Sequence, residues 1–431
     1  MREMKDSGIE WIGKIPEKWK LRRAKTLFTQ RNSKGNENEV LLSPTQKYGV
    51  VPQSQLEGVV QVKEDTDLQM FKTVHKGDFV ISLRSFQGGF EYSLYEGVCS
   101  PAYQVFYPTS PICDTYYRYL FKSQSFISKM NNLTVGIREG KNIQYVDFAN
   151  SQIPVPPLAE QERIATFLDA ECAEIDAVLE KTRVSIEEYK KLKQAVITQA
   201  VTKGIRGDRP MKDSGIAWIG EIPAEWGVVR QKYFWNTVES GVSVNAADKP
   251  VDNSEQYGVL KTSAVSKFVF IPTEHKQVNL EEYGRVSCPV RADSIIASRM
   301  NTPELVGACG YVQNNYPNLF LPDRLWQITY KNGLSPKYVW YYLSGIRVRQ
   351  YISSLSTGTS SSMQNISQSQ YGNIFITIPS VGEQAEITKY LDEKCSSVDA
   401  LIFKKQQYMT EIENYKKSLI YEYVTGKKEV T

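Results

Sequence analysis

The chain has 431 residues, of which 41% are hydrophobic and 23% charged; this composition is typical of globular proteins and excludes disordered and collagen-like classes. Its 52 basic and 48 acidic residues leave a net charge of +4, which neither demands nor excludes a nucleic-acid partner. Two histidines, and six cysteines without a C-x-x-C pair, predict neither a zinc site nor a histidine-rich catalytic centre. Without a signal-peptide pattern or a run of 18 apolar residues, we expect a cytoplasmic protein with no membrane span.

The opening segment of the chain recurs later in the sequence. Residues 4–19 read MKDSGIEWIGKIPEKW and residues 211–226 read MKDSGIAWIGEIPAEW, so 12 of 16 positions agree at an offset of 207. The similarity continues at an offset of 215 from Asp78 to Asp293, and at 223 from Gln104 to Gln327 and beyond. We therefore predict two copies of one fold, with about 16 additional residues inside the second.

The middle part of each copy alternates short β-like runs with turn residues and short helical stretches. This pattern predicts two mixed α/β globular domains and an α+β fold class for the whole chain. The middle parts of the two copies differ in sequence, whereas their beginnings and ends are similar. One scaffold that presents two different surfaces would produce this distribution.

Two polar, glycine-containing segments in each middle are suited to reading DNA, because Arg can form two hydrogen bonds with guanine and Asn or Gln two with adenine. The candidates in the first copy are Arg84, Ser85, Gln87, Gly88, Arg138, Lys141 and Asn142. Those in the second copy are Arg299, Asn301, Thr302, Thr359, Ser360, Gln364 and Asn365. An ordinary surface turn is the alternative for each segment, and Asn142 and Asn365 fit a turn equally well.

Each copy closes on a segment with a heptad pattern of apolar residues and no internal proline or glycine, which predicts two helices of about 37 residues, each about 55 Å long. The predicted seam consists of Ile164, Leu168, Ile175, Leu179, Ile186, Ile387, Leu391, Val398, Ile402 and Met409. Residues 160–180 and 181–206 carry charges of −6 and +5, and residues 383–403 and 404–428 carry −3 and +3. One interpretation is that these charges only form solvated helix faces. The other is that the acidic half of each helix pairs with the basic half of the other, which favours an intramolecular antiparallel coiled coil.

Antiparallel pairing returns the end of the chain toward its beginning and predicts two globular domains related by a pseudo-two-fold axis. The expected domains are 1–155 and 207–378, with spacer helices in 156–206 and 379–431. No catalytic pattern is present: the sequence has neither G-x-G-x-x-G nor the Asn/Asp-Pro-Pro-Tyr/Phe of adenine methyltransferases. We therefore expect a chain that binds DNA without catalysing a reaction.

The repeated KDSGIEWIGKIPEKW and KDSGIAWIGEIPAEW, together with IPVPPLAEQERIATFLD and IPSVGEQAEITKYLD, resemble the specificity subunit of type I restriction–modification systems over nearly the whole chain. The resemblance implies two target-recognition domains, each reading one half of a split double-stranded DNA site, and a coiled coil that sets the unread spacer. It also implies two methyltransferase subunits and additional restriction subunits as partners. S-adenosylmethionine, ATP and Mg would then be bound by those partners, and no cofactor or metal by this chain. The alternative is an architectural or regulatory DNA-binding protein that acts without a methyltransferase.

Overall fold

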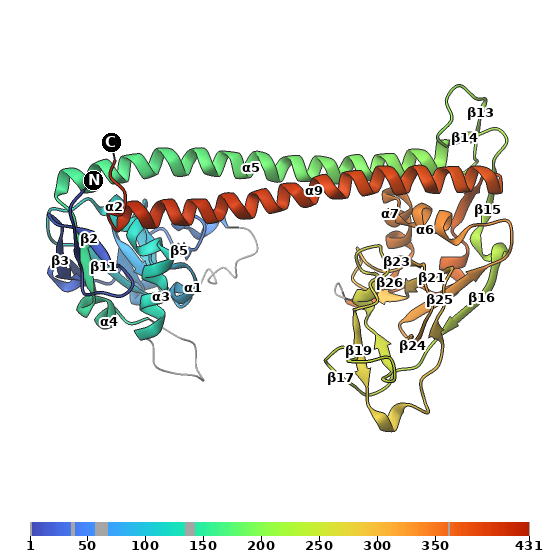
Figure 1. Ribbon diagram of the computed structural model, residues 1–431, viewed down its shortest axis with the longest axis horizontal. Coiled ribbons are helices and arrows are strands. Elements are labelled where there is room, and N and C mark those ends of the chain that lie inside the picture. Colours follow the sequence, from blue (N-terminus) through green and yellow to red (C-terminus); the bar gives the residue numbers. More distant parts are fainter. Residues whose placement is uncertain (1, 36–38, 57–67, 134–142, 361–362, 431) are drawn as a thin grey trace. The chain divides into compact units, whose positions relative to one another are not determined.

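The computed structural model describes residues 2–35, 39–56, 68–133, 143–360 and 363–430 (Figure 1). Contacts between residues divide the chain into two compact units. The first unit comprises Met1–Arg183 and Gln406–Thr431, and the second comprises Val184–Lys405. Each unit therefore contains one globular part and one half of each long helix, whereas the sequence-based boundaries follow the chain from element to element.

The first unit contains twelve strands within its described residues. They are β1 (Met4–Asp6), β2 (Lys14–Pro16), β3 (Lys20–Arg23), β4 (Phe28–Arg31), β5 (Leu42–Thr45), β6 (Gly49–Pro52), β7 (Lys72–Val74), β8 (Phe79–Ile81), β9 (Glu91–Tyr92), β10 (Gly97–Cys99), β11 (Gln104–Pro108) and β12 (Gln152–Val155). Its short helices are α1 (Ser85–Gly88), α2 (Asp114–Lys122), α3 (Gln124–Leu133) and α4 (Tyr145–Asn150). The central sheet has the order β4-β11-β8-β9.

The second unit has a larger set of strands. They are β13 (Met211–Asp213), β14 (Glu221–Pro223), β15 (Gly227–Arg230), β16 (Trp235–Ser240), β17 (Ala246–Ala247), β18 (Gly258–Leu260), β19 (His275–Val278), β20 (Pro289–Val290), β21 (Ser294–Ser298), β22 (Met300–Asn301), β23 (Cys309–Val312), β24 (Tyr316–Phe320), β25 (Leu325–Tyr330), β26 (Thr357–Ser360), β27 (Met363–Asn365) and β28 (Phe375–Ile378). Its short helices are α6 (Pro336–Ser344), α7 (Ile346–Leu355) and α8 (Gln368–Gly372). Its central sheet has the order β16-β25-β21-β23, and a five-stranded sheet, β17-β19-β18-β24-β20, covers a separate apolar cluster.

Strand registers confirm the duplication and the offsets predicted from sequence. Lys5 pairs with Ile15 in the first unit and Lys212 with Ile222 in the second, which reproduces the offset of 207. In the central sheets, the pairs Val105–Val80 and Ile328–Ile295 correspond at offsets of 223 and 215. Both units therefore have the same framework of strands. The sequence differences between the two copies lie in the segments attached to this framework.

The long helices are α5 (Leu158–Lys203, 46 residues) and α9 (Val381–Val424, 44 residues). The prediction of about 37 residues was too short, because each helix starts directly after its proline-containing strand connection and continues past the last seam residue. Seam residues Ile164, Leu168, Ile175, Leu179, Ile186, Ile387 and Leu391 are buried, and Val398, Ile402 and Met409 are half-buried. A hydrophobic seam thus runs along both helices, as the heptad pattern predicted.

The helices pair antiparallel in each unit. In the first unit, the early part of α5 packs with the end of α9, and Asp176 lies 2.6 Å from Lys416. In the second, the end of α5 packs with the start of α9, and Lys193 lies 2.6 Å from Asp399. An offset of 223 converts one ion pair into the other with the helices exchanged. The predicted pairing of acidic with basic halves is therefore confirmed.

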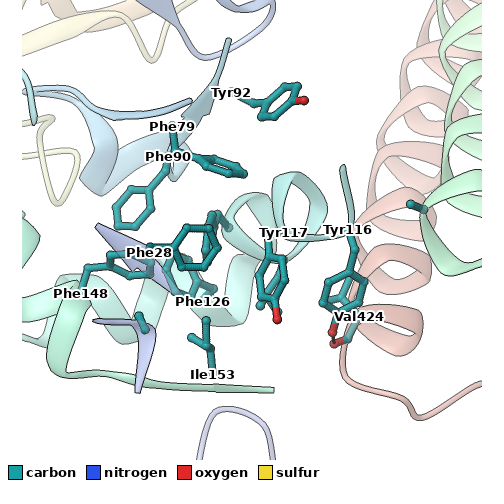
Figure 2. Close-up of a cluster of buried hydrophobic side chains, with 14 of the residues drawn as sticks. Phe28, Phe79, Phe90, Tyr92, Tyr116, Tyr117, Phe126, Phe148, Ile153 and Val424 are labelled. Atoms are coloured by element: carbon teal, nitrogen blue, oxygen red, sulfur yellow. Dashed lines mark hydrogen bonds between the residues drawn. The ribbon is translucent and has the colours of Figure 1, made fainter. Parts of the chain in front are cut away.

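Each globular part is anchored to both helices, and Figure 2 shows this anchoring in the first unit. Phe28, Phe79 and Phe90 belong to an aromatic core in which ring centroids lie 5–6 Å apart, for example 5.8 Å for Phe28 and Phe79. At the edge of this core the Tyr116 hydroxyl donates to the Val424 carbonyl at 2.7 Å. Near the same end, Lys427 Nζ donates to the Ile12 carbonyl at 2.7 Å, so the end of α9 lies against the opening segment.

A carboxylate near the start of each long helix, buried at Glu383 and half-buried at Glu160, completes the scaffold. Glu383 Oε2 accepts from Trp226 Nε1 at 2.8 Å, and Glu383 Oε1 accepts from Arg209 Nη1 at 2.5 Å. In the first unit, Glu160 Oε2 accepts from Trp19 Nε1 at 2.9 Å. The negative charge also suits the positive end of the helix dipole. This network gives Trp19 and Trp226 the same role in the two copies of the repeated opening.

Candidate nucleic-acid interface

In the second unit, the two candidate segments lie side by side, although 55 residues separate them in sequence. Strands β22, β27 and β26 form one small antiparallel sheet in which Met300 pairs with Asn365 and Asn301 with Gln364. An ordinary surface turn was the alternative for the segment that contains Thr359 and Ser360, but its backbone forms strand β26 of this sheet. The sequence predicted the two segments separately, and the fold makes them one surface.

The surface in the second unit is positioned mainly through its backbone. Arg299 follows β21; its amide donates to the Arg324 carbonyl at 3.0 Å, and its carbonyl accepts from Ile366 N at 3.0 Å. The half-buried guanidinium lies 3.5 Å from the Asp323 carbonyl. Asn301 Oδ1 accepts from the Thr302 amide at 2.9 Å, so this side chain also orders the turn that follows. We call Arg299–Asn301 with β26 and β27 the second reader.

In the first unit, Arg84 and Gln87 are exposed at the corresponding place, directly after β8 and on the turn that α1 forms. Ser85 does not fit the expectation of a DNA contact: it is 1% exposed, and its Oγ accepts from Ser82 N at 2.7 Å. Its hydroxyl therefore stabilises the turn from the inside. Gly88 also has a structural role, since an added Cβ would lie 2.7 Å from Gln46.

A turn that the sequence reading did not select, Gln46–Tyr48 between β5 and β6, lies against this helix. Gln46 Nε2 donates to Gln87 Oε1 at 3.3 Å, and the Tyr48 ring is 61% exposed beneath the Lys47 ammonium. An exposed aromatic ring beside Arg, Lys and Gln side chains suits contact with nucleic acid. The repeated Tyr-Gly-Val at 48–50 was the available sequence signal. We call Gln46–Tyr48 with Arg84–Gln87 the first reader.

The first reader borders a cavity of about 720 Å³. Its lining includes Thr45, Gln46, Tyr48, Arg84, Glu91 and Tyr103. Lys122 Nζ lies 2.6 Å from Glu91 Oε2 and 3.3 Å from the Gln46 carbonyl, so this ion pair links the interior to the reader turn. Burial raises the pKa of Glu91 to about 7, although Lys122 opposes the shift.

A pH-dependent contribution to stability follows from Glu91. Because the pKa in the folded state lies above the unfolded value of 4.5, this group stabilises the fold fully at low pH and progressively less as pH rises through about 7. We expect Glu91→Gln to lose this dependence, which amounts to at most about 3 kcal/mol. Urea unfolding at about pH 5 and about pH 8 measures it. The exposed Glu17→Gln serves as the control, and an unaltered pH dependence in Glu91→Gln would refute the assignment.

Three candidates in the first copy, Arg138, Lys141 and Asn142, lie outside the described residues. Directly after them, Gln144 Oε1 accepts from Gln104 Nε2 at 2.9 Å, and Gln104 pairs with Ile81 at the end of β8. The chain therefore resumes next to the strand that precedes Arg84. Among the described residues, no group of three or more His, Cys, Asp or Glu side chains could hold a metal ion, and no helix is long and apolar enough to cross a membrane.

Each unit combines an equivalent globular framework with antiparallel segments of the two long helices. Residues 16–188 match the family described as "Type I restriction modification DNA specificity domain". Residues 16–188, which include most of the first globular part and the first part of α5, are therefore similar to type I restriction–modification specificity domains.

Curated relatives extend this similarity beyond the matched domain. The chain is 22% identical to the EcoKI specificity subunit of Escherichia coli K12 over 73% of its own length, and 28% identical to the MjaVIII specificity subunit of Methanocaldococcus jannaschii over 67%. The match spans 65% of the length of each of these relatives. A chain from a solved structure concerned with assembly of the type I R-M system superimposes with a TM-score of 0.68 at 16% identity, covering 95% of this chain and 98% of that one. This likeness supports the fold.

Proposed function

We propose that the chain is the sequence-specific DNA-recognition subunit of a type I restriction–modification complex and is itself not catalytic. One observation carries the proposal: equivalent sheets in the two units end in turns that carry Arg with different polar neighbours. Arg84 accompanies Gln46 and Gln87, whereas Arg299 accompanies Asn301. Each unit would thus read a different half of an asymmetric bipartite site by donating to and accepting from base edges.

The paired helices have the properties of a spacer and of a partner surface. Their seam is buried, yet several large apolar side chains face solvent. On α5 these are Val178, Val184 and Leu192, and on α9 they are Leu401, Phe403, Tyr408 and Tyr415. Exposed apolar residues on a charged helix pair are typical of protein interaction surfaces. We propose that methyltransferase subunits dock here and that restriction subunits join the complex. S-adenosylmethionine, ATP and Mg would be bound by these partners in the cytoplasm.

Two experiments test this function. Purification of the chain from its host is expected to recover a methyltransferase subunit, identified by mass spectrometry. Selection of the purified complex on a pool of random duplexes is expected to enrich two short motifs separated by a gap of constant length. A chain that binds DNA tightly alone and recovers no methyltransferase would favour the architectural alternative. Enrichment of one uninterrupted motif would contradict two separate readers.

Substitution of the two reader arginines tests the base contacts. Arg84→Ala and Arg299→Ala are each expected to reduce binding of the selected duplex by about 1–3 kcal/mol and to relax one position in one half only. Fluorescence anisotropy with duplexes altered in either half measures both effects. Arg285→Ala, which removes an exposed arginine of the second unit outside the reader, is the control. Equal losses on all duplexes would indicate phosphate contacts instead.

A further inference from the structure

A buried arginine, Arg349 on α7, contacts the turn that follows Asn301 of the second reader. Its side chain is only 9% exposed, and its Nη2 donates to two carbonyls of one turn, Glu304 O at 3.2 Å and Val306 O at 2.6 Å. The Phe268 ring centroid lies 4.9 Å from the guanidinium carbon. Among the described residues, Arg349 forms no ion pair, and its Nε and Nη1 are buried without hydrogen-bond partners. A buried charge of this kind is costly unless its neighbours are fixed around it.

The turn that Arg349 holds is continuous with the reader strand. It follows Asn301 and closes back on β21, because Gly307 N donates to Ser298 O at 2.7 Å and Ser298 N donates to Ala308 O at 2.8 Å. Gly307 has a positive φ of 67°, and a Cβ added there would lie 2.7 Å from Ile352 Cγ2, 3.2 Å from Tyr371 and 3.4 Å from Arg349 Nη1. The position of the turn, and with it that of Asn301, is therefore coupled to the guanidinium.

The first unit has a matching contact of different chemistry. Gly89 closes the turn of the first reader with a φ of 77°; a Cβ added there would clash with the Phe121 carbonyl and would lie 3.3 Å from Ile127 Cγ1. Ile127 occupies on α3 the place that Arg349 occupies on α7, at an offset of 222. Both units thus support the reader turn with a residue from the same helical position. The Ile127 side chain is apolar, whereas the Arg349 side chain donates hydrogen bonds to the turn.

We propose that Arg349 is a positioning residue for the second reader: it sets the 302–307 turn and thereby the orientation of Asn301 toward DNA. This inference rests on the proposed function, because it concerns the accuracy with which one half of the site is read. A merely structural Arg349 would affect folding and binding of all duplexes alike. A positioning residue would affect discrimination within one half only.

The test uses the full-length complex and compares Arg349→Met with Arg347→Met, which removes an exposed arginine from the same helix. Each variant is selected on the same random duplex pool as wild type, after circular dichroism has established that it is folded at the temperature used. We expect Arg349→Met to lose roughly tenfold in discrimination within the second half, comparable to a hydrogen bond to a charged group. The first half and the gap are expected to remain, and Arg347→Met to match wild type.

The possible outcomes distinguish failure of the proposed role of Arg349 from failure of the proposed function. A wild-type complex that selects no bipartite motif would refute the proposed function. A wild-type motif that Arg349→Met retains in full, or loses equally in both halves, would overturn the role of Arg349. If Arg349→Met does not fold, Arg349→Lys is used, because it retains the charge and one donor group. A loss confined to the second half is then expected, and an unchanged or uniform result would overturn the inference.

Discussion

Glu383→Ala is expected to destabilise the second unit by about 3–5 kcal/mol, the range for breaking one side of a buried ion pair. The carboxylate is 3% exposed and accepts from both Arg209 and Trp226. Removing it leaves the Trp226 indole N–H without an acceptor and the Arg209 guanidinium with only the exposed Glu225 carboxylate and the Lys203 carbonyl as acceptors. Urea unfolding followed by circular dichroism measures the loss as a lower midpoint.

Glu386→Ala provides a matched control one turn further along the same helix. Its carboxylate lies 2.7 Å from Arg206, but the two side chains are 50% and 57% exposed. Exposed ion pairs contribute less than about 1 kcal/mol, so this variant is expected to stay close to wild type. Equal effects of the two substitutions would contradict the assignment of Glu383 as the anchor of the helix start.

The second large effect concerns the length of the helix pair. One heptad inserted after Arg183 alone is expected to break the pairing register, since the seam residues of α5 beyond the insertion are then displaced by one heptad from their partners on α9. One heptad inserted after Arg183 and another after Lys405 restore the register. The matched insertions add about 10.5 Å and are expected to widen the unread gap by about three base pairs.

Random duplex selection measures the gap, and circular dichroism measures the stability of both insertion variants. Matched insertion of seven alanine-rich residues in each helix, with seam positions kept as Leu, preserves the apolar pattern. A destabilised single insertion with a widened gap in the matched pair supports the spacer role. An unchanged gap in a folded matched variant would show that the helices do not set the spacing.

Much of the fold could be predicted because the sequence contains two copies of one pattern, which can be compared with each other. The offsets of 207, 215 and 223 reappear as strand registers, and the charge asymmetry of the closing segments reappears in the pairs Asp176–Lys416 and Lys193–Asp399. Repeats and heptads are local patterns with a fixed period, so they can be recognised in the sequence without knowledge of tertiary contacts. The ends of the long helices depend on how preceding strands connect, and their length was underestimated.

The readers were only partly predictable, because they are made by contacts between distant segments. Nothing near Gln46 indicates that its amide donates to Gln87, and the pairing of Asn301 with Gln364 spans 63 residues. Ser85 has the composition of a surface turn, yet its hydroxyl is buried within that turn. Residue type and spacing therefore located the polar segments at one edge of each sheet. They could not tell which polar side chains face outward.

Exchange of the globular part of the second unit tests the central claim most directly. Residues 227–378 are replaced by the corresponding segment of another specificity subunit, and the complex is selected on the random duplex pool. The motif is expected to change in one half, while the other half and the gap remain as in wild type. A change in both halves, or in the gap alone, would contradict a chain in which each unit reads its own part of the DNA.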